Sequence, residues 1–331
     1  MPKVLHIGPC QTRGGMANVM RILAEHPPKG WEAELLSSHV SGSPWAKWRA
    51  YRKARGSFAR MLNDAHSRPD IVHLHTAADW SWWRKRRFAK MAHKAGVPII
   101  VHIHSGQFDT WLLQRHFLGR TNAQMLNHLV TRLDLHLVVL STYWQNRLEP
   151  LLGDCSVVNN PVHPRYQRPP IGERIVGKIL LLGRNDPVKG HNFAVEVVNM
   201  ARNINPNLTL WMTGISEHDE PWVHALGWVD ESKLLYHLQS AQLLLLPSSH
   251  EGQPLVALEA LACGLPVIAS KGLPPLAGVI EVNSDTESWQ EEILSSLENK
   301  NGCAPLIQNH QHEVSQVQLK WAKLYESLIL V

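Results

Sequence analysis

The chain has 331 residues, with 33 lysine and arginine residues against 28 aspartate and glutamate residues, and a formal net charge of +5. This length favours two domains, and an apolar fraction of 44% with 13 tryptophans excludes a chain that is disordered throughout. The net charge hides an asymmetry. Residues 1–170 hold 23 basic and 10 acidic residues (+13), whereas residues 171–331 hold 10 and 18 (−8). Two halves of opposite charge are expected to have different functions.

Membrane-spanning and secreted classes are disfavoured. The longest apolar runs, such as Leu243–Leu246, are far shorter than the ~18–20 residues that a spanning helix needs. The opening residues MPKVLHIG lack the charged-then-apolar pattern of a signal peptide. Cys10, Cys155, Cys263 and Cys303 stand alone, without CxxC pairs, which favours a reducing, cytoplasmic location.

Short apolar runs alternate with longer helical patterns along the whole chain. The predicted strands are Val4–Gly8, Ile71–His75, Ile99–His104, Leu135–Leu140, Ser156–Asn159, Ile179–Gly183, Leu208–Thr213, Gln242–Pro247 and Pro266–Ser270. The predicted helices are Met16–Glu25, Phe193–Ile204, Ser232–Gln239, Leu255–Cys263 and, at the end, Glu313–Leu330. Near-continuously apolar strands between helices predict an α/β fold with doubly wound parallel sheets, buried on both faces.

A domain boundary is expected in the stretch Asn160–Gly177, which is rich in proline and lacks apolar periodicity. The predicted domains are residues 1–165 and residues 178–312. The final amphipathic helix, 313–331, is assigned to the first domain because it need not pack where its position in the sequence suggests.

The first motif follows a predicted buried strand and reads LLLGRNDPVKG over Leu180–Gly190. It places Arg184 and Lys189 five residues apart beside the start of a helix near His191. Two cations next to a helix N-terminus suit a diphosphate group. The alternative is that both are ordinary surface charges flanking a loop.

The second motif, Ser248–Ser270, contains a helix that starts near Pro254, a position where proline is well tolerated. The free amides of Leu255 and Val256 at its start suit an anion. Glu259 could accept hydrogen bonds from a diol such as a ribose, and Glu251 on the preceding loop could accept them from sugar hydroxyls. A solvated position for Glu259 is the alternative, but its neighbours are apolar, so this carboxylate is expected to need a partner.

A glycine-rich loop, Gly8–Asn18 (GPCQTRGGMAN), follows the first predicted strand and could let the backbone approach a phosphate or a sugar. It contains neither GxGxxG nor GxxxxGK[ST], so it carries no dinucleotide fingerprint and no P-loop.

With these motifs the chain resembles the retaining, nucleotide-sugar-dependent glycosyltransferases of glycosyltransferase family 4. The most specific feature is Glu251-x7-Glu259. The segments Gly183–Gly190 and Leu226–Ser248 and the Gly14-Gly15 loop support it. The resemblance extends over nearly the whole chain and is closest over residues 178–275. It implies the GT-B fold, in which two Rossmann-like domains face a cleft.

The resemblance also implies roles for single residues. Arg184 and Lys189 would hold the donor diphosphate, Glu259 the ribose and Glu251 the transferred sugar, while the backbone near Trp228 would meet the base. Gly183 would also bind the donor nucleotide, Gly15 would line the cleft near the phosphates and the acceptor, and His104 would lie near the donor sugar. The catalytic set is therefore Arg184, Lys189, Glu251 and His104. No cofactor and no obligatory metal are expected, because the nucleotide-sugar is a co-substrate.

Two departures from the family pattern limit these inferences. The glutamate loop reads EGQP where phenylalanine and glycine more commonly follow EG, so no sugar preference is inferred. The segment Lys271–Gly278 is also atypical.

Two histidine pairs need a separate interpretation. His73-x-His75 and His102-x-His104 each place two rings on one face of a strand. Together they could bind a metal, but no acidic or cysteine residues nearby complete a ligand set. Hydrogen-bonded histidines in the wall of a cleft are the favoured interpretation.

Two basic segments, Ser43–Arg60 and Trp80–Lys94, each hold six lysine or arginine residues and no acid. Cations interleaved with aromatic residues suit an anionic membrane surface. A solvated basic face and single-stranded nucleic acid are the alternatives, and no nucleic-acid-binding module accompanies the segments. The residues expected at this membrane or acceptor surface are Trp45, Trp48, Arg49, Arg52, Lys53, Trp82, Trp83, Arg84, Arg86 and Arg87.

The resemblance to this family implies a retaining hexosyltransferase that uses a UDP-sugar or, alternatively, a GDP-sugar. The expected acceptor is lipid-linked or a polysaccharide precursor in cell-surface glycan synthesis, such as lipopolysaccharide or capsule. The enzyme would lie at the inner face of the cytoplasmic membrane. The alternatives are a GT-B-fold UDP-sugar epimerase and a non-catalytic scaffold that binds sugar nucleotides.

Overall fold

The computed structural model describes residues 1–115, 119–167, 172–298 and 310–329. Cys303 therefore lies outside the described residues. The chain divides into two compact units: Met1–Pro161 together with Gln311–Val331, and Val162–His310. The parts of these two units that are described are treated separately below.

The first unit contains a six-stranded sheet in which all neighbouring strands run parallel, in the order β2-β1-β3-β4-β5-β6. Its strands are β1 (Lys3–Gly8), β2 (Glu32–Ser37), β3 (Ile71–Thr76), β4 (Ile99–Ile103), β5 (Leu135–Val139) and β6 (Cys155–Val157). Its helices are α1 (Gly15–Glu25), α2 (Pro44–Asn63), α3 (Trp80–Lys94), α4 (Phe108–Leu113), α5 (Asn122–Leu133), α6 (Thr142–Leu152) and α11 (Val314–Ile329).

The second unit repeats this plan with a parallel six-stranded sheet in the order β12-β11-β10-β7-β8-β9. Its strands are β7 (Lys178–Leu181), β8 (Thr209–Met212), β9 (Val223–Ala225), β10 (Leu243–Leu246), β11 (Val267–Ser270) and β12 (Val279–Val282). Its helices are α7 (His191–Arg202), α8 (Glu231–Ser240), α9 (Leu255–Ala262) and α10 (Thr286–Glu298). Short 3-10 turns occur at η1 (Pro164–Tyr166), η2 (Pro187–Lys189) and η3 (His310–His312).

The predicted fold class, two doubly wound parallel sheets, is confirmed. Three strands were missed by the sequence prediction, namely β2, β9 and β12. All three lie at sheet edges. An edge strand is covered less completely than a central one, so it does not need a continuous apolar run. The residues of β2, for example, are partly or fully exposed throughout.

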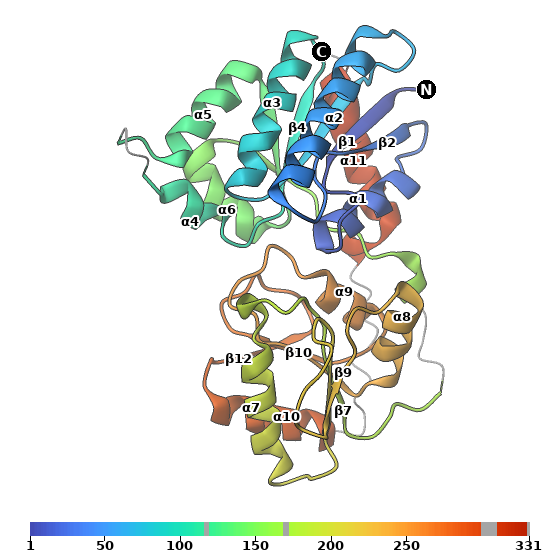
Figure 1. Ribbon diagram of the computed structural model, residues 1–331, viewed down its shortest axis with the longest axis vertical. Coiled ribbons are helices and arrows are strands. Elements are labelled where there is room, and N and C mark those ends of the chain that lie inside the picture. The colour runs from blue at the N-terminus through green and yellow to red at the C-terminus, as the bar shows by residue number, and fades with distance from the viewer. Residues whose placement is uncertain (116–118, 168–171, 299–309, 330–331) are drawn as a thin grey trace. The chain divides into compact units, whose positions relative to one another are not determined.

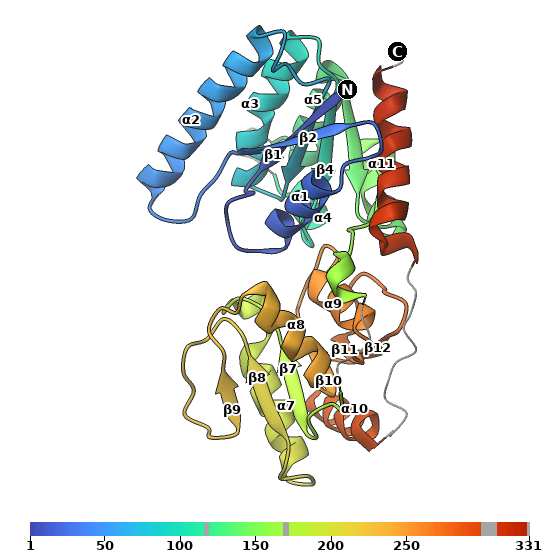
Figure 2. The same ribbon diagram turned by 90° about the vertical axis from the view of Figure 1, so that its right-hand side faces the viewer.

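The C-terminal helix α11 returns to the first unit, as predicted. Trp321 and Tyr325 on this helix are each 1% exposed. The Gln318 side chain donates to the carbonyl oxygens of His26 and Pro27, each at 3.1 Å. Figure 2 shows α11 along the sheet of this unit, on the side away from α2 and α3. A helix from the end of the chain thus covers strands from its beginning.

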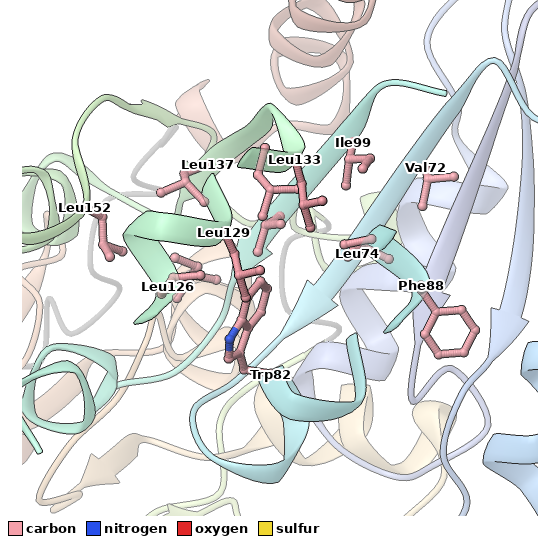
Figure 3. Close-up of a cluster of buried hydrophobic side chains, with 14 of the residues drawn as sticks. Val72, Leu74, Trp82, Phe88, Ile99, Leu126, Leu129, Leu133, Leu137 and Leu152 are labelled. Carbon is pink, nitrogen blue, oxygen red and sulfur yellow. The ribbon is translucent and has the colours of Figure 1, made fainter. Parts of the chain in front are cut away.

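The core of the first unit fills the space between the sheet and the helices α2, α3, α5 and α6. Figure 3 shows Val72 and Leu74 of β3 and Ile99 of β4 in this cluster, with Trp82 and Phe88 of α3. Among the described residues, no helix is long and apolar enough to cross a membrane.

Candidate active site

Three loops meet at the C-terminal edge of the second sheet, where ligands of open α/β sheets usually bind. They follow β7, β8 and β10. The amide of Ser249 donates to the carbonyl of Val188 at 2.9 Å, which ties the loop after β10 to the loop after β7. The backbones also approach closely. A Cβ on Gly190 would lie 2.6 Å from the Pro247 carbonyl oxygen, and one on Gly214 would lie 2.5 Å from that of Gly183. Both glycines have positive φ, so the packing and the backbone conformation both require glycine there.

Lys189 and Glu251 form an ion pair at this edge. The Lys189 Nζ lies 2.5 Å from the Glu251 Oε1, and the two side chains are only 22% and 12% exposed. The residues predicted to bind the diphosphate and the sugar are therefore direct neighbours, although they are far apart in the sequence. A phosphate arriving at Lys189 would compete with the Glu251 carboxylate for its ammonium group.

The other cation of the motif, Arg184, is largely exposed. Its Nη2 lies 3.7 Å from the Asp186 Oδ2, a loose contact between two side chains that are 65% and 37% exposed. The loop backbone is held more firmly, because the amide of Gly183 donates to the Thr213 Oγ1 at 2.8 Å. The Arg184 side chain is thus accessible to a ligand, whereas the Gly183 backbone is anchored to Thr213.

Helix α9 starts directly after the Glu251 loop, with Pro254 at its N-cap and no side-chain cap. The first amides of a helix have no partner within it, so those of Leu255 and Val256 offer donors and a positive helix end. This start agrees with the predicted helix start near Pro254.

Glu259 lies further along α9 and is only 4% exposed. Burial raises the pKa of its carboxyl to about 8. The nearby Glu231 raises it further, while Arg165 opposes the shift. Arg165 and Glu231 themselves form an ion pair. The sequence analysis expected Glu259 to need a partner. It did not identify Arg165 or Glu231 as the charged residues near this carboxyl. Arg165 lies in the proline-rich stretch and Glu231 starts α8, so no spacing in the sequence links them to Glu259.

Trp228 lies at the same edge of the sheet and is 47% exposed. The loop that carries it is held by the amide of Gly214, which donates to the carbonyl of Gly227 at 2.8 Å. A flat aromatic side chain exposed beside the loop after β8 offers a surface on which a base can stack.

Gly15 and His104 belong to the first unit, so they are described apart from the residues above. Gly15 is the first residue of α1 and follows Gly14, which has a φ of 137°. His104 follows β4, and its Nε2 lies 3.0 Å from the Nδ1 of His75. Burial lowers the pKa of His104 to about 3, so the imidazole is neutral at physiological pH.

His104 is one end of a buried cluster of five imidazoles on β1, β3 and β4. The Nε2 of His75 lies 3.0 Å from the Nδ1 of His6, so His6, His75 and His104 form one chain of close ring contacts. Beside it, the Nε2 of His73 lies 3.3 Å from the Nδ1 of His102, and its Nδ1 lies 3.0 Å from the Tyr325 hydroxyl. The predicted hydrogen-bonded histidines are therefore present, and His6 and Tyr325 join them from elsewhere in the chain.

The same cluster contains the described groups within the first unit that could hold a metal ion. These are His6 with His73 and His75, and His75 with His102 and His104, whose ligand nitrogens lie within 4.8 Å of one another. Three imidazoles are a ligand set that Zn²⁺ accepts. The sequence analysis found only two pairs because His6 is far away in the sequence. The expectation that no metal is required stays a prediction.

One residue assigned to the basic surface is misplaced. Trp82 is 1% exposed and packs in the core of the first unit (Figure 3). Trp82 was assigned to the basic surface because of the composition of its segment. In the structure it lies on the face of α3 that packs on the sheet. By contrast, Trp45 and Trp48 at the start of α2 are 63% and 44% exposed and stack on each other at 4.7 Å.

The remaining members of the predicted surface lie on the same two helices. Arg52 places its guanidinium over the Trp48 ring at 4.8 Å, and Arg86 places its own over the Trp83 ring at 4.4 Å. Arg49, Lys53 and Arg87 are exposed, whereas Arg84 is half-buried.

The fold is shared with known structures. Sucrose-phosphate synthase from Thermosynechococcus elongatus superposes with a TM-score of 0.71 over 100% of both chains, at 17% sequence identity. Two doubly wound parallel sheets, one of which carries cations and a free helix start at its C-terminal edge, define this chain as a protein of the GT-B class.

Both halves of the sequence also match family models. Residues 6–163 match the glycosyl transferase 4-like domain, and residues 177–299 match glycosyl transferases group 1. The two matches together take up most of the chain, which belongs to this family of glycosyltransferases.

Two curated relatives illustrate the similarity. Glycogen synthase from Mycobacterium tuberculosis is 26% identical over 236 residues, which cover 64% of this chain and 54% of the relative. O-antigen chain mannosyltransferase B from Escherichia coli is 34% identical over 95 residues, which cover 27% of this chain and 25% of that protein. The chain thus spans about half the length of the first of these relatives.

Proposed function

We propose that the protein is a retaining glycosyltransferase that moves a sugar from a nucleoside-diphosphate donor to an acceptor. The observation that carries the proposal is the arrangement in the second unit, where the ion pair of Lys189 and Glu251 is followed directly by the free start of α9 and the buried Glu259. Family membership and the names of the two relatives, both of which denote sugar-transferring enzymes, support it.

The proposed chemistry follows from the charge of the leaving group. As the glycosidic bond breaks, negative charge develops on the departing diphosphate. Lys189, Arg184 and the first amides of α9 can stabilise that charge, so no metal is required in this scheme. When the diphosphate draws Lys189 away, the Glu251 carboxylate becomes free to accept hydrogen bonds from the sugar. Retention would follow from attack on the front face, with the departing phosphate accepting the proton of the acceptor.

We also propose the chemical class of the donor and of the acceptor. We favour a UDP-sugar, with a GDP-sugar as the alternative, and a lipid-linked or polysaccharide-precursor acceptor of cell-surface glycans. The O-antigen chain mannosyltransferase among the relatives supports an acceptor of this kind.

We also propose that the surface of α2 and α3 attaches the protein peripherally to the inner face of a membrane. Trp45 and Trp48 are large exposed aromatics on a helix that has six basic residues and no acid, and Trp80 at the start of α3 is 77% exposed. A basic helix with exposed tryptophans gains both apolar and electrostatic contacts at an anionic bilayer.

The test of the donor is a thermal-shift screen with UDP-, GDP-, ADP- and CMP-sugars, followed by an assay for release of the nucleoside diphosphate. A ligand that binds only the native state raises the melting temperature. We expect one nucleotide class to raise it, and Lys189→Met to lower turnover by orders of magnitude. Binding without any donor hydrolysis or transfer would contradict the proposal and favour a non-catalytic role. Release of an epimerised free sugar would favour an epimerase.

The test of the membrane surface is co-sedimentation with vesicles of phosphatidylcholine, with and without one-third phosphatidylglycerol. We expect binding only to the anionic vesicles, and weaker binding of the double variant Trp45→Ala/Trp48→Ala. Equal binding to both vesicle types would reject electrostatic attachment.

A further inference from the structure

Lys85 is a lysine in the interior of the first unit. It lies on the same stripe of α3 as Trp82, Phe88 and Ala92, the stripe that packs toward the sheet, and it is 1% exposed. Buried lysines are rare in proteins unless they are paired with an acidic group. Among the described residues, none forms a salt bridge or a hydrogen bond with the Lys85 ammonium. The helix face predicts an apolar residue at this position, so the charge there needs another explanation.

The surroundings of Lys85 lie at the C-terminal edge of the first sheet. Gly8 ends β1 and is in register with Ser37, which ends β2, and the amide of Ser38 donates to the Gly8 carbonyl at 2.8 Å. The loops after these two strands carry Cys10 and His39, and the charge of Lys85 lowers the pKa of both side chains. Such an influence requires proximity. The ammonium thus lies near the edge at which open α/β sheets bind ligands.

The charges that act on Lys85 and His39 are mostly positive, and Cys10 alone raises the pKa of Lys85. Burial lowers the pKa of Lys85 to about 7, and Arg84 lowers it further. Burial also lowers the pKa of His39 to about 4, with Arg84, Lys47 and Lys85 acting in the same direction. Cys10 does not supply a counter-charge, because burial raises the pKa of its thiol and keeps it neutral. The site therefore lacks the negative group that its charges require.

Polar atoms beside it also lack partners. Ser38 is fully buried, and its Oγ makes no hydrogen bond within the described structure. The Nδ1 of His39 and the Nε of Arg84 are buried and unpaired in the same way. A buried polar atom without a partner costs free energy, so several of them together around an unpaired cation indicate that a ligand completes them. That ligand must be an anion with several acceptor oxygens.

We infer that Lys85, Arg84, Ser38 and His39 form a binding site for a phosphoryl group, at the C-terminal edge of β1 and β2. The start of α1 follows the loop after β1 and would add the positive end of a helix. Apart from Gly15, the residues assigned to the donor diphosphate lie in the second unit, so we assign this group to the acceptor. That last step rests on the proposed function, whereas the phosphoryl site does not. The acceptor class is then a sugar phosphate or a lipid-linked phosphate or diphosphate.

This site differs from the exposed membrane surface described above. The exposed residues of α2 would contact headgroups at the surface of a bilayer, whereas Lys85 could only reach a group that enters the fold. The phosphoryl site and the membrane surface are therefore expected to respond differently to pyrophosphate and to anionic vesicles.

The test uses Cys10, which is half-buried beside the site, as a local reporter in the full-length protein. Its alkylation by iodoacetamide at pH 7 is followed by peptide mass spectrometry, without ligand, with inorganic pyrophosphate, and with phosphatidylcholine vesicles with or without one-tenth phosphatidic acid. Each rate is normalised to the same variant without ligand. The variants are Lys85→Met and Lys90→Met, an exposed lysine of the same helix that serves as the matched control. Lys189→Met is included to weaken pyrophosphate binding at the proposed donor site.

We expect pyrophosphate to slow alkylation of Cys10 at least threefold in the wild type, in Lys90→Met and in Lys189→Met, and to have no effect in Lys85→Met. Arg84→Gln serves as a second variant if Lys85→Met does not fold, and it should reduce the protection at least twofold. Protection by phosphatidic acid vesicles alone would support the site with a membrane-borne phosphate as its ligand. The absence of protection by any probe, or equal protection in Lys85→Met, would overturn the inference.

The thermal-shift screen with nucleotide-sugars separates this inference from the proposed function. Donor binding and turnover without protection of Cys10 would refute the phosphoryl site and leave the glycosyltransferase proposal intact. Protection of Cys10 without donor binding would support the phosphoryl site and contradict the glycosyltransferase proposal.

Discussion

The substitution Glu259→Gln should stabilise the protein in alkaline solution and have little effect in acid. Glu259 is 4% exposed, and its pKa is about 8 in the folded protein against 4.5 as the ordinary value. The unfolded chain therefore releases this proton at lower pH than the folded chain does. The stability of the wild type consequently falls as the pH rises from about 4.5 to about 8, and levels off above that.

The size of the effect follows from the difference between the two pKa values. Each unit corresponds to about 1.4 kcal/mol, so the wild type loses up to about 5 kcal/mol over this range, of which about 3 kcal/mol is lost by pH 7. Glutamine has nearly the same shape and no charge. The variant should match the wild type within about 1 kcal/mol at pH 5 and exceed it by about 2–5 kcal/mol at pH 9. At pH 9, where the wild-type side chain is ionised, the same change should weaken nucleoside diphosphate binding, because an amide is a poorer acceptor for a ribose diol than a carboxylate.

The assay is urea unfolding of the wild type and the variant at pH 5, 7 and 9, followed by circular dichroism, with nucleotide affinity measured by calorimetry. Glu291→Gln, at an exposed position of α10 in the same unit, is the control and should shift little at any pH. If the free energies of unfolding of Glu259→Gln and wild type differ by a constant amount from pH 5 to pH 9, the assigned ionisation of Glu259 is wrong.

Three further predictions concern single side chains. Lys189→Met should lower turnover by about 10²–10³-fold, the range expected for a lost electrostatic contact to a developing charge, while circular dichroism and the melting temperature change little; near-normal turnover would refute its assignment to the diphosphate. Trp82→Ala should cost about 3–5 kcal/mol in urea unfolding because it empties a buried space, whereas Trp45→Ala should cost less than about 0.5 kcal/mol; similar costs would contradict their different burial. Tyr325→Phe should cost about 1–3 kcal/mol because it leaves the Nδ1 of His73 without its partner at 3.0 Å; an unchanged free energy of unfolding would show that this contact does not stabilise α11 on the sheet.

The sequence alone predicted the architecture of the central sheets. A strand such as β10 is covered on both faces, so its residues form a continuous apolar run that can be read without any tertiary information. Edge strands such as β2 carry no such signal, because only part of their surface is covered. The motif residues Lys189, Glu251 and Glu259 were also found from the sequence, since each lies at a fixed distance from a strand end or a helix start.

Contacts between distant segments were decided by the tertiary structure. Lys189 meets Glu251 only because β7 and β10 are neighbours in the sheet. His6 joins His75 for the same reason in the first unit, since β1 pairs with β3. No local pattern specifies which strands become neighbours, because pairing order depends on how the whole chain packs.

The segment Trp80–Lys94 shows most clearly which properties follow from the sequence and which from the tertiary structure. Its composition, with six cations and no acid, is a property of the sequence and predicts a basic surface. Whether a given side chain faces water or the sheet depends on how the helix is rotated against the strands beneath it. That rotation buries Trp82 and Lys85 and leaves Trp80 exposed. The sequence therefore determined how much positive charge this half of the protein carries. Only the packing of α3 determined that one of those charges lies inside, where it requires an anion.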